Sequence, residues 1–308
     1  MHQIFLTKPF SIATMVIVIF CINGGIPMID RPYEIADAHT HIFPQKIAEK
    51  AAHSIADFYK VNAGDVGTVD ILLENGRRLG ISHYLVCSVA TTPKQVPSIN
   101  HFIAQNCDAH PEFIGFGTIH PGMTETEMIT EAVRIKEKGL RGIKLHPDIQ
   151  DFLLDDPHMF ALYRMCEKEL SLPILFHCGD ARYDRSSPKR LAHVLDLFPE
   201  LSVIGAHFGG YSQWEEAYAT LKDYDRLHMD TSSSLSFLSD EAAMRLIEGY
   251  GPERLMFGTD YPLWVMQKEL DRFFSLPLTD AQRRQILFGT FSALFDVPEK
   301  PKTCHRVQ

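Results

Sequence analysis

The chain has 308 residues, of which 45% are hydrophobic and 22% charged, an ordinary globular composition. That length exceeds a typical single domain, yet one α/β barrel of about 250 residues accommodates it. A net charge of −9, without any run of Lys or Arg, argues against the clustered basic surface that nucleic-acid binding needs, so no nucleic-acid partner is expected. The six cysteines are scattered and form no C-x-x-C pair, which favours reduced thiols and a cytoplasmic protein.

Residues 1–27 form an apolar N-terminal extension. The run at 10–22 (FSIATMVIVIFCI) follows Lys8 and resembles the central region of a signal peptide. It is shorter than the roughly 20 residues of a membrane-spanning helix, so no stable membrane insertion is expected. No A-x-A-like cleavage site follows it, and we favour Met28 as the true start, with export as the alternative. N-terminal sequencing decides, because a mature terminus at or before residue 27 contradicts a start at Met28.

Eight apolar runs alternate with helical patterns along the rest of the chain. Helical spacing is clear over 125–138 and 157–170, where Thr124 and Asp156 are suitable first caps and Gly139 a suitable end. Such alternation is typical of βα units and a parallel sheet. It predicts an α/β fold, a closed (β/α)₈ TIM barrel, as one domain over 28–300 with a tail over 301–308. The eight predicted strands cover 35–42, 83–89, 113–119, 141–147, 173–178, 202–207, 226–232 and 254–260.

Polar side chains end six of these strands. In a parallel barrel the carboxyl ends of the strands converge on one face, where active sites lie. Side chains two residues apart on a strand point the same way, so His39 and His41 share one space. Converging imidazoles and carboxylates predict a site for Zn²⁺ or a similar ion. The strand-end residues are His39, His41, Lys144, His146, His177, His207, Asp230 and Asp260.

Four motifs in this order, DAHTH, FHCGD, AHFGG and FGTDYP, resemble the amidohydrolase superfamily. The closest resemblance is to its amidohydrolase-related branch, which includes aminocarboxymuconate-semialdehyde decarboxylase and aromatic-acid decarboxylases, and it covers residues 35–295. The resemblance implies one divalent ion, with Zn²⁺ favoured over Mn²⁺, held by His39, His41, His177 and Asp260. It also implies that Asp260 exchanges protons with water or substrate, and that His207 acts beside the ion on the water or the developing oxyanion.

Lys144 is open to three interpretations. It could be carboxylated and bridge two metals, as in some binuclear amidohydrolases, or form an ion pair with Asp230. We favour a third role, a plain cation that recognises a substrate carboxylate, because the closer branch binds one metal. His146 shares its face and is expected to form part of the pocket wall.

The loop at 179–188, after the fifth predicted strand, is long for a βα connection and carries Arg182 and Tyr183. Loops at the rim of a barrel often determine specificity. An arginine there suits bidentate contact with a carboxylate. Simple solvation of these charges is an equal alternative.

The favoured function is a metal-dependent hydrolase of a small amide, lactone or ester, using a metal-activated water. The alternative is a non-oxidative decarboxylase of an aromatic or unsaturated acid. The resemblance to the closer branch supports this alternative. A barrel that only binds a ligand, and a metal-free lactonase, are weaker possibilities, since fold does not fix chemistry. The mass balance separates the first two functions: a decarboxylase releases CO₂ from its substrate, whereas a hydrolase adds water to it. The expected partner is a small-molecule substrate, with carboxylates as one candidate class. The resemblance also implies a homodimer, because this branch commonly forms homodimers.

Overall fold

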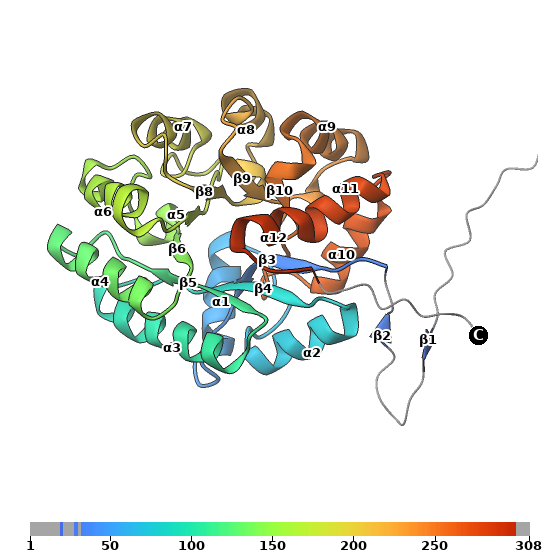
Figure 1. Cartoon of the computed structure of the whole chain (residues 1–308), viewed down its shortest axis with the longest axis horizontal. Coiled ribbons are helices and arrows are strands. Elements are labelled where there is room, and N and C mark those ends of the chain that lie inside the picture. Colours follow the sequence, from blue (N-terminus) through green and yellow to red (C-terminus); the bar gives the residue numbers. More distant parts are fainter. Residues whose placement is uncertain (1–18, 21–27, 30–31, 300–308) are drawn as a thin grey trace, which may run out of the picture.

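A computed structural model of the chain describes residues 19–20, 28–29 and 32–299. Eight parallel strands follow one another in chain order around a barrel, with the helices on the outside (Figure 1). The predicted (β/α)₈ barrel is therefore confirmed. The start at Met28 concerns a segment most of which lies outside the described residues. The strands are β3 (Ala36–His41), β4 (His83–Cys87), β5 (Phe113–Thr118), β6 (Gly142–Leu145), β7 (Ile174–Phe176), β8 (Val203–Gly205), β9 (Leu227–Asp230) and β10 (Leu255–Met256).

The barrel closes where β3 meets β10 and the loop after it. The backbone N–H of Asp260 donates to the carbonyl of His39 at 2.9 Å. Beside this bond, the buried carboxylate of Asp37 accepts from the Thr259 backbone N–H at 2.9 Å and from the Thr259 hydroxyl at 2.6 Å. The first and last barrel strands are thus joined through both backbone and side chains. A further antiparallel pair, β1 (Ile19–Phe20) with β2 (Met28–Ile29), precedes the barrel.

The helices cover the outer face of the barrel. Within the described ranges, none of them is long and apolar enough to cross a membrane. The helix predicted from residue 125 begins at its predicted cap, because the side chains of Thr124 and Glu127 form a reciprocal capping box. The main helices are α1 (Ala48–Tyr59), α2 (Val69–Leu79), α3 (Val96–Ala109), α4 (Glu125–Glu137), α6 (Phe160–Met165), α7 (Pro188–Leu197), α8 (Trp214–Leu221), α9 (Asp240–Tyr250) and α10 (Met266–Ser275).

The helix predicted over 157–170 consists of three different pieces. A 3₁₀ turn (Pro157–Met159) leads into α6, and a π-helix (Cys166–Leu170) ends the segment. The Asp156 side chain accepts from the backbone N–H of His158 at 2.9 Å, as expected for the predicted cap. The periodic apolar pattern identified the segment but not these changes of helical pitch.

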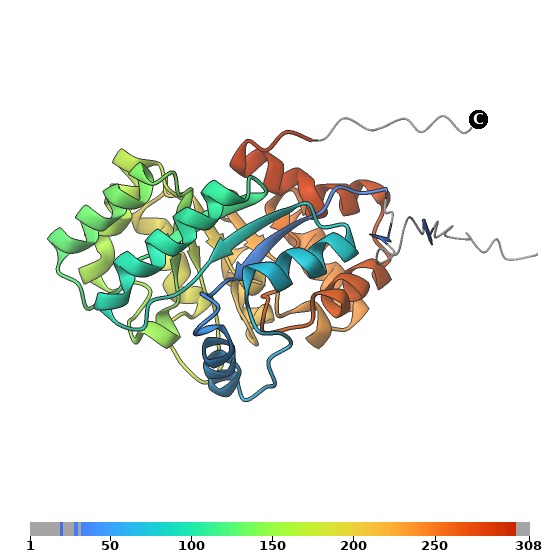
Figure 2. The ribbon, with the colours of Figure 1, turned by 90° about the horizontal axis from the view of Figure 1, so that it is seen from below.

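Aromatic side chains plug one end of the barrel. Phe288 comes from a π-helix (Gln285–Gly289), and Phe291 and Phe295 from α12 (Thr290–Phe295). They pack with inward-facing strand residues such as Leu175 and Ile204 in a core inside the barrel. Figure 2 shows α12 at one end of the barrel and α1 at the other. Since α1 follows β3, it lies at the carboxyl ends of the strands, which are left for polar groups.

Candidate active site and metal centre

The polar strand-end residues predicted from the sequence lie together at the carboxyl end of the barrel. All eight residues are buried, with at most 7% of their surface exposed. Seven of them line one cavity, and Asp230 lies behind His39. Burial of so many ionisable groups is costly unless they are hydrogen-bonded or bind an ion. The carboxyl end of the barrel therefore contains buried ionisable side chains that need hydrogen-bond partners or a bound ion.

His207 and Asp260 have an unusual backbone conformation. Their φ angles are 62° and 58°, in the left-handed region that side chains other than glycine seldom adopt. Each is fixed by a hydrogen bond from its own N–H: His207 donates to Asp230 Oδ1 at 3.2 Å, and Asp260 to the carbonyl of His39 at 2.9 Å. Such conformations cost on the order of 1–3 kcal/mol and are common at functional sites. Asp260 lies beyond the two-residue strand β10, so the predicted strand over 254–260 was too long.

Asp260 faces two imidazoles. Its Oδ1 atom lies 3.5 Å from His39 Nε2 and 3.4 Å from His41 Nε2. Its Oδ2 atom accepts the hydroxyl of Ser233 at 2.6 Å. Burial alone would raise the pKa of Asp260, but the surrounding imidazoles hold it well below its usual range. An ionised carboxylate and two imidazole nitrogens within 4.8 Å of one another form a donor set that fits a divalent ion.

Asp230 orients His39 from behind. Its Oδ2 lies 2.9 Å from His39 Nδ1, and its Oδ1 accepts the Ser232 hydroxyl at 2.5 Å. Burial would raise the pKa of Asp230, but the charges and hydrogen bonds of His39 and His207 lower it to about 2. Because the carboxylate accepts a hydrogen bond from the Nδ1–H of His39, Nε2 keeps its lone pair and faces Asp260. A carboxylate that orients a histidine in this way is the usual outer partner of a metal ligand.

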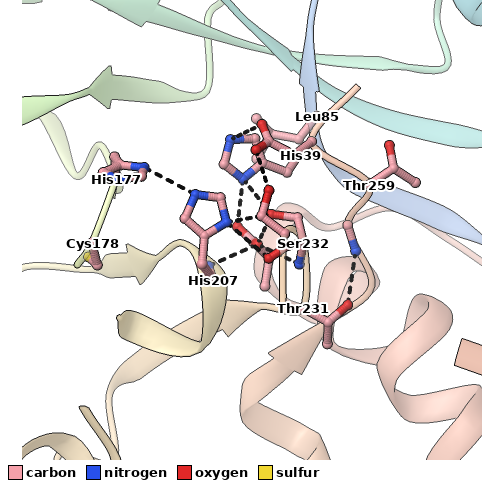
Figure 3. A network of polar contacts seen from close by, with 12 residues as sticks. His39, Leu85, His177, Cys178, His207, Thr231, Ser232 and Thr259 are labelled. Atoms are coloured by element: carbon pink, nitrogen blue, oxygen red, sulfur yellow. Dashed lines mark hydrogen bonds and ion pairs between the residues drawn. The ribbon is translucent and has the colours of Figure 1, made fainter. Parts of the chain in front are cut away.

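His177 and His207 face each other across the same end of the barrel (Figure 3). His177 Nδ1 lies 3.1 Å from His207 Nε2. The other nitrogen of each ring lies 3.0 Å from a backbone carbonyl, that of Gly179 for His177 and that of Ser232 for His207. A carbonyl only accepts, so each takes the single N–H of its neutral ring. Two lone pairs then face each other, so the pair needs a proton or a cation between them, and burial lowers the pKa of both histidines.

His177 belongs to a second group of ligand atoms. Its Nε2 lies 3.5 Å from Asp148 Oδ2, and its ring stacks on His146 with centroids 3.9 Å apart. These three residues offer atoms within 4.8 Å of one another, separately from the group of His39, His41 and Asp260. The structure thus brings His177 into the shared cavity, but outside the group of ligand atoms that His39, His41 and Asp260 form.

Lys144 is completely buried, and its Nζ lies 3.2 Å from His39 Nε2. The ion pair with Asp230 considered from the sequence is wrong. Within residues 32–299, no ion pair of 4.0 Å or less involves Lys144, since Asp230 faces His39 instead. Burial first, and then the nearby Lys144 ammonium, lower the pKa of His39 to about 4. His39 is therefore neutral near pH 7, and the positive charge of Lys144 has no carboxylate neighbour in this part of the chain.

Tyr59, at the end of α1, is a site residue that the sequence analysis missed. Its hydroxyl lies 2.8 Å from His146 Nε2 and 3.3 Å from His177 Nε2. His146 Nδ1 accepts the backbone N–H of Ile149 at 3.3 Å, so its Nε2 carries the proton and donates to Tyr59. The Tyr59 O–H is then left for a ligand. Burial raises its pKa well above the usual value, so it stays a neutral donor. No local motif marks this tyrosine, because only the placement of α1 brings it over the histidines.

A cavity of about 630 Å³ extends from these groups to the surface. Its inner end is formed by the histidines, Lys144 and Asp260, while most of its walls are apolar side chains of α1, α3 and the adjacent loops. Ligand sites of enzymes commonly have this volume, apolar walls and a few converging polar groups. The apolar wall includes Phe43, Ile47, Ile55, Phe58, Ile99 and Phe102.

Comparison with known families identifies the barrel. The profile of the family described as amidohydrolase matches residues 36–296, most of the chain. The chain belongs to the amidohydrolase family. This agrees with the resemblance of the four motifs, which supply His39, His41, His177, His207 and Asp260 at the strand ends.

Individual relatives of this amidohydrolase are more distant. It is 25% identical over 199 residues to a 2-amino-3-carboxymuconate-6-semialdehyde decarboxylase of Dictyostelium discoideum, over 53% of this chain and 55% of that protein. The match thus spans about half the length of that relative. A TIM-barrel protein of Bordetella bronchiseptica superposes with a TM-score of 0.72 at 19% identity, over 85% of this chain and 98% of the other. A dihydroxybenzoic acid decarboxylase of Polaromonas sp., with bound manganese and the inhibitor 2-nitroresorcinol, gives 0.66 at 16% identity, over 86% and 97%.

The loop predicted at 179–188 contacts α1 of the amidohydrolase rather than the cavity. Arg182 Nη2 pairs with Asp180 at 2.6 Å, and its Nη1 donates to the carbonyl of Phe58 at 2.7 Å. Tyr183 stacks on the ring of Phe58 with centroids 5.8 Å apart. Neither Arg182 nor Tyr183 lines the cavity. The structure thus does not bring these two predicted substrate-binding residues to the site, because the buried carboxylate of Asp180 and the end of α1 hold the guanidinium.

Proposed function

We propose that this amidohydrolase is a metal-dependent decarboxylase that removes a carboxyl group non-oxidatively from an aromatic or unsaturated acid. The observation that carries the proposal is one cavity with its histidines, Lys144 and Asp260 at the inner end and mainly apolar walls elsewhere. A carboxylate loses its charge when it leaves as CO₂, so surroundings that solvate it poorly favour the step. Two of the relatives described above are decarboxylases of acids of this kind.

We further propose that one divalent ion, Zn²⁺ or Mn²⁺, is held by His39, His41, His177 and Asp260. The support is the donor chemistry of His39, His41 and Asp260, whose imidazole nitrogens and ionised carboxylate lie within 4.8 Å of one another, while His177 lines the same cavity. Such an ion supplies Lewis acidity that polarises a substrate oxygen or a water. Manganese in the Polaromonas relative makes Mn²⁺ the first ion to test.

The residues of the chain have separate proposed roles. Lys144 gives the inner end a buried positive charge that favours an anionic substrate, and His146 with Tyr59 offers a neutral hydrogen-bond donor. A proton that Asp260 takes up from water passes to the carbon that bears the carboxylate. The bond between that carbon and the carboxyl group then breaks, its electron pair stays on the substrate, and CO₂ leaves. His207 is proposed to contact the oxygen on which negative charge develops.

Hydrolysis of an amide, lactone or ester is the second candidate. It is favoured by the position of Asp260, whose ionised carboxylate faces the donor set and so is placed to accept a proton from water. The same cluster therefore serves either reaction, and the products distinguish them.

The test uses full-length protein loaded with Mn²⁺ and a panel of hydroxybenzoic and unsaturated dicarboxylic acids in D₂O. We expect release of CO₂ and one deuterium at the vacated carbon, with both lost in Asp260→Asn. The matched control is Asp155→Asn, whose carboxylate pairs with Arg190 and His193 away from the site. Turnover of esters or lactones without CO₂ release would establish hydrolysis instead. Saturable binding without any turnover would leave only a binding barrel.

A further inference from the structure

We propose that the substrate of this enzyme carries an extended apolar group, which binds between α1 and α3. The apolar arm of the cavity is defined here by Ile47, Ala51, Ile55, Ile99 and Phe102. The inference rests on the proposed function, because that function assigns the acid end of the substrate to the histidines and Asp260. The substrate class is then an acid with an alkyl, alkenyl or second-ring substituent, rather than a single small ring.

Two helices turn matching faces toward this arm. On α1, positions 47, 51, 55 and 58 follow one another at intervals of four, four and three residues, which places them on one side of the helix. On α3, Ile99 and Phe102 are three residues apart and line the same cavity. Since the inner end of this cavity contains His39 and Asp260, a molecule bound there extends naturally along the two apolar faces.

The volume exceeds what one ring requires. At about 30 Å³ for each water-sized group, 630 Å³ holds roughly twenty such groups. A benzoic acid with two small substituents needs about half of that space. The remaining half lies beside the mainly apolar side chains of the arm, so an apolar part of the same ligand is the occupant that fits it.

Hydrogen bonds hold the end of α1 that borders the arm. The far end of α1 is held by the Arg182 guanidinium, which donates to the carbonyl of Phe58 at 2.7 Å. Tyr59 is held on the neighbouring turn by its hydrogen bond of 2.8 Å to His146. Preorganisation of this kind reduces the free-energy cost of binding.

The arm also leaves apolar surface uncovered. Ile47, at the start of α1, is 51% exposed, while Ile99 and Phe102 are half-buried. The mouth around them carries the polar side chains of Lys50, Ser54 and Gln95 in the same cavity lining. An apolar chain that runs from the histidines toward this mouth covers the uncovered surface and ends where water can reach it.

The test measures binding rather than turnover. The probes are 2-hydroxybenzoic acids with a 4-alkyl group from methyl to hexyl, titrated by calorimetry into the full-length protein loaded with Mn²⁺. Each methylene buried in the arm is expected to tighten Kd by about fourfold, the equivalent of ~0.8 kcal/mol. A Kd that changes less than twofold across the whole series overturns the inference.

Two variants on α1 locate the effect. Ala51→Phe fills the arm, so the gain in affinity with chain length should disappear. His53→Phe adds an aromatic ring to the same helix at an exposed position outside the cavity lining, and should keep the gain. Equal dependence on chain length in both variants would show that the alkyl groups bind elsewhere. Thermal unfolding of each variant confirms that α1 is still folded.

The two proposals fail in different ways. Tighter binding with longer chains, without CO₂ release from any acid, supports the arm and removes the proposed reaction. CO₂ release from small acids, with affinity independent of chain length, supports the reaction and overturns the arm. Tighter binding that persists in Ala51→Phe overturns the arm whatever the reaction.

Discussion

Replacement of Asp230 by Asn should weaken metal binding without touching a proposed ligand. Asp230 Oδ2 lies 2.9 Å from His39 Nδ1, while its Oδ1 accepts the backbone N–H groups of His207 at 3.2 Å and Ser232 at 3.0 Å. An Asn side chain has one accepting oxygen and one NH₂ group. Whichever way it is turned, the NH₂ group meets a donor: the Nδ1–H of His39 on one side, or two backbone N–H groups on the other.

The size of the effect follows from these contacts. Asp230 and His39 are at most 1% exposed, and a buried hydrogen bond to a charged group contributes about 1.5–3 kcal/mol. We therefore expect the Kd for Mn²⁺ to rise by about 10- to 100-fold, the range typical for loss of an outer partner of a metal ligand. Competition with a chromophoric chelator measures it. Asp155→Asn is the remote control, and a Kd for Asp230→Asn within threefold of wild type would refute the assignment of His39 as an oriented ligand.

Three further substitutions test other parts of the molecule. Tyr59→Phe removes the hydroxyl 2.8 Å from His146 Nε2; because one neutral hydrogen bond is worth about 1 kcal/mol, kcat/KM should fall about fivefold while metal content stays the same. Loss of bound metal in this variant would contradict the assigned role. Phe291→Ala should cost about 3–5 kcal/mol in urea unfolding, since this ring is 1% exposed in the plug of the barrel; a cost below 1 kcal/mol would mean that the plug is not a tight core. Burial raises the pKa of Glu269 from 4.5 to about 7, so the folded protein keeps this proton longer than the unfolded chain and loses stability as the pH rises through that interval. Relative to wild type at the same metal loading, Glu269→Gln should gain about 2–3 kcal/mol between pH 4 and pH 8, and an unchanged difference would contradict the raised pKa.

The sequence predicted those features that depend on local pattern and chain order. The eight strands follow from apolar runs, and His39, His41, His207 and Asp260 converge because parallel strands end on one face. The length of the last strand was not predictable. The predicted strand runs to residue 260, whereas β10 pairs with β9 at Leu255 and Met256 and ends there.

The direction of a long side chain and the placement of a distant helix could not be read from the sequence. Arg182 turns toward Asp180 and the end of α1, because the buried carboxylate of Asp180, two residues away, binds its guanidinium. Tyr59 reaches His146 only because α1 folds back over the barrel. Lys144 was placed correctly at the inner end, but its neighbour is His39 rather than Asp230.

The contact between β3 and β10, which closes the barrel, can form only after the last strand has been synthesised. Asp37 and Thr259, which bond across it, are 222 residues apart, and His39 and Asp260 stand on its two sides. At about 5–20 residues per second, a ribosome needs roughly ten to forty seconds to extend the chain from one side to the other. During that interval the growing chain contains His39 and His41 but no Asp260, so the proposed donor set is incomplete. An ion would then bind after the two strands have met, and its binding would stabilise their contact by mass action.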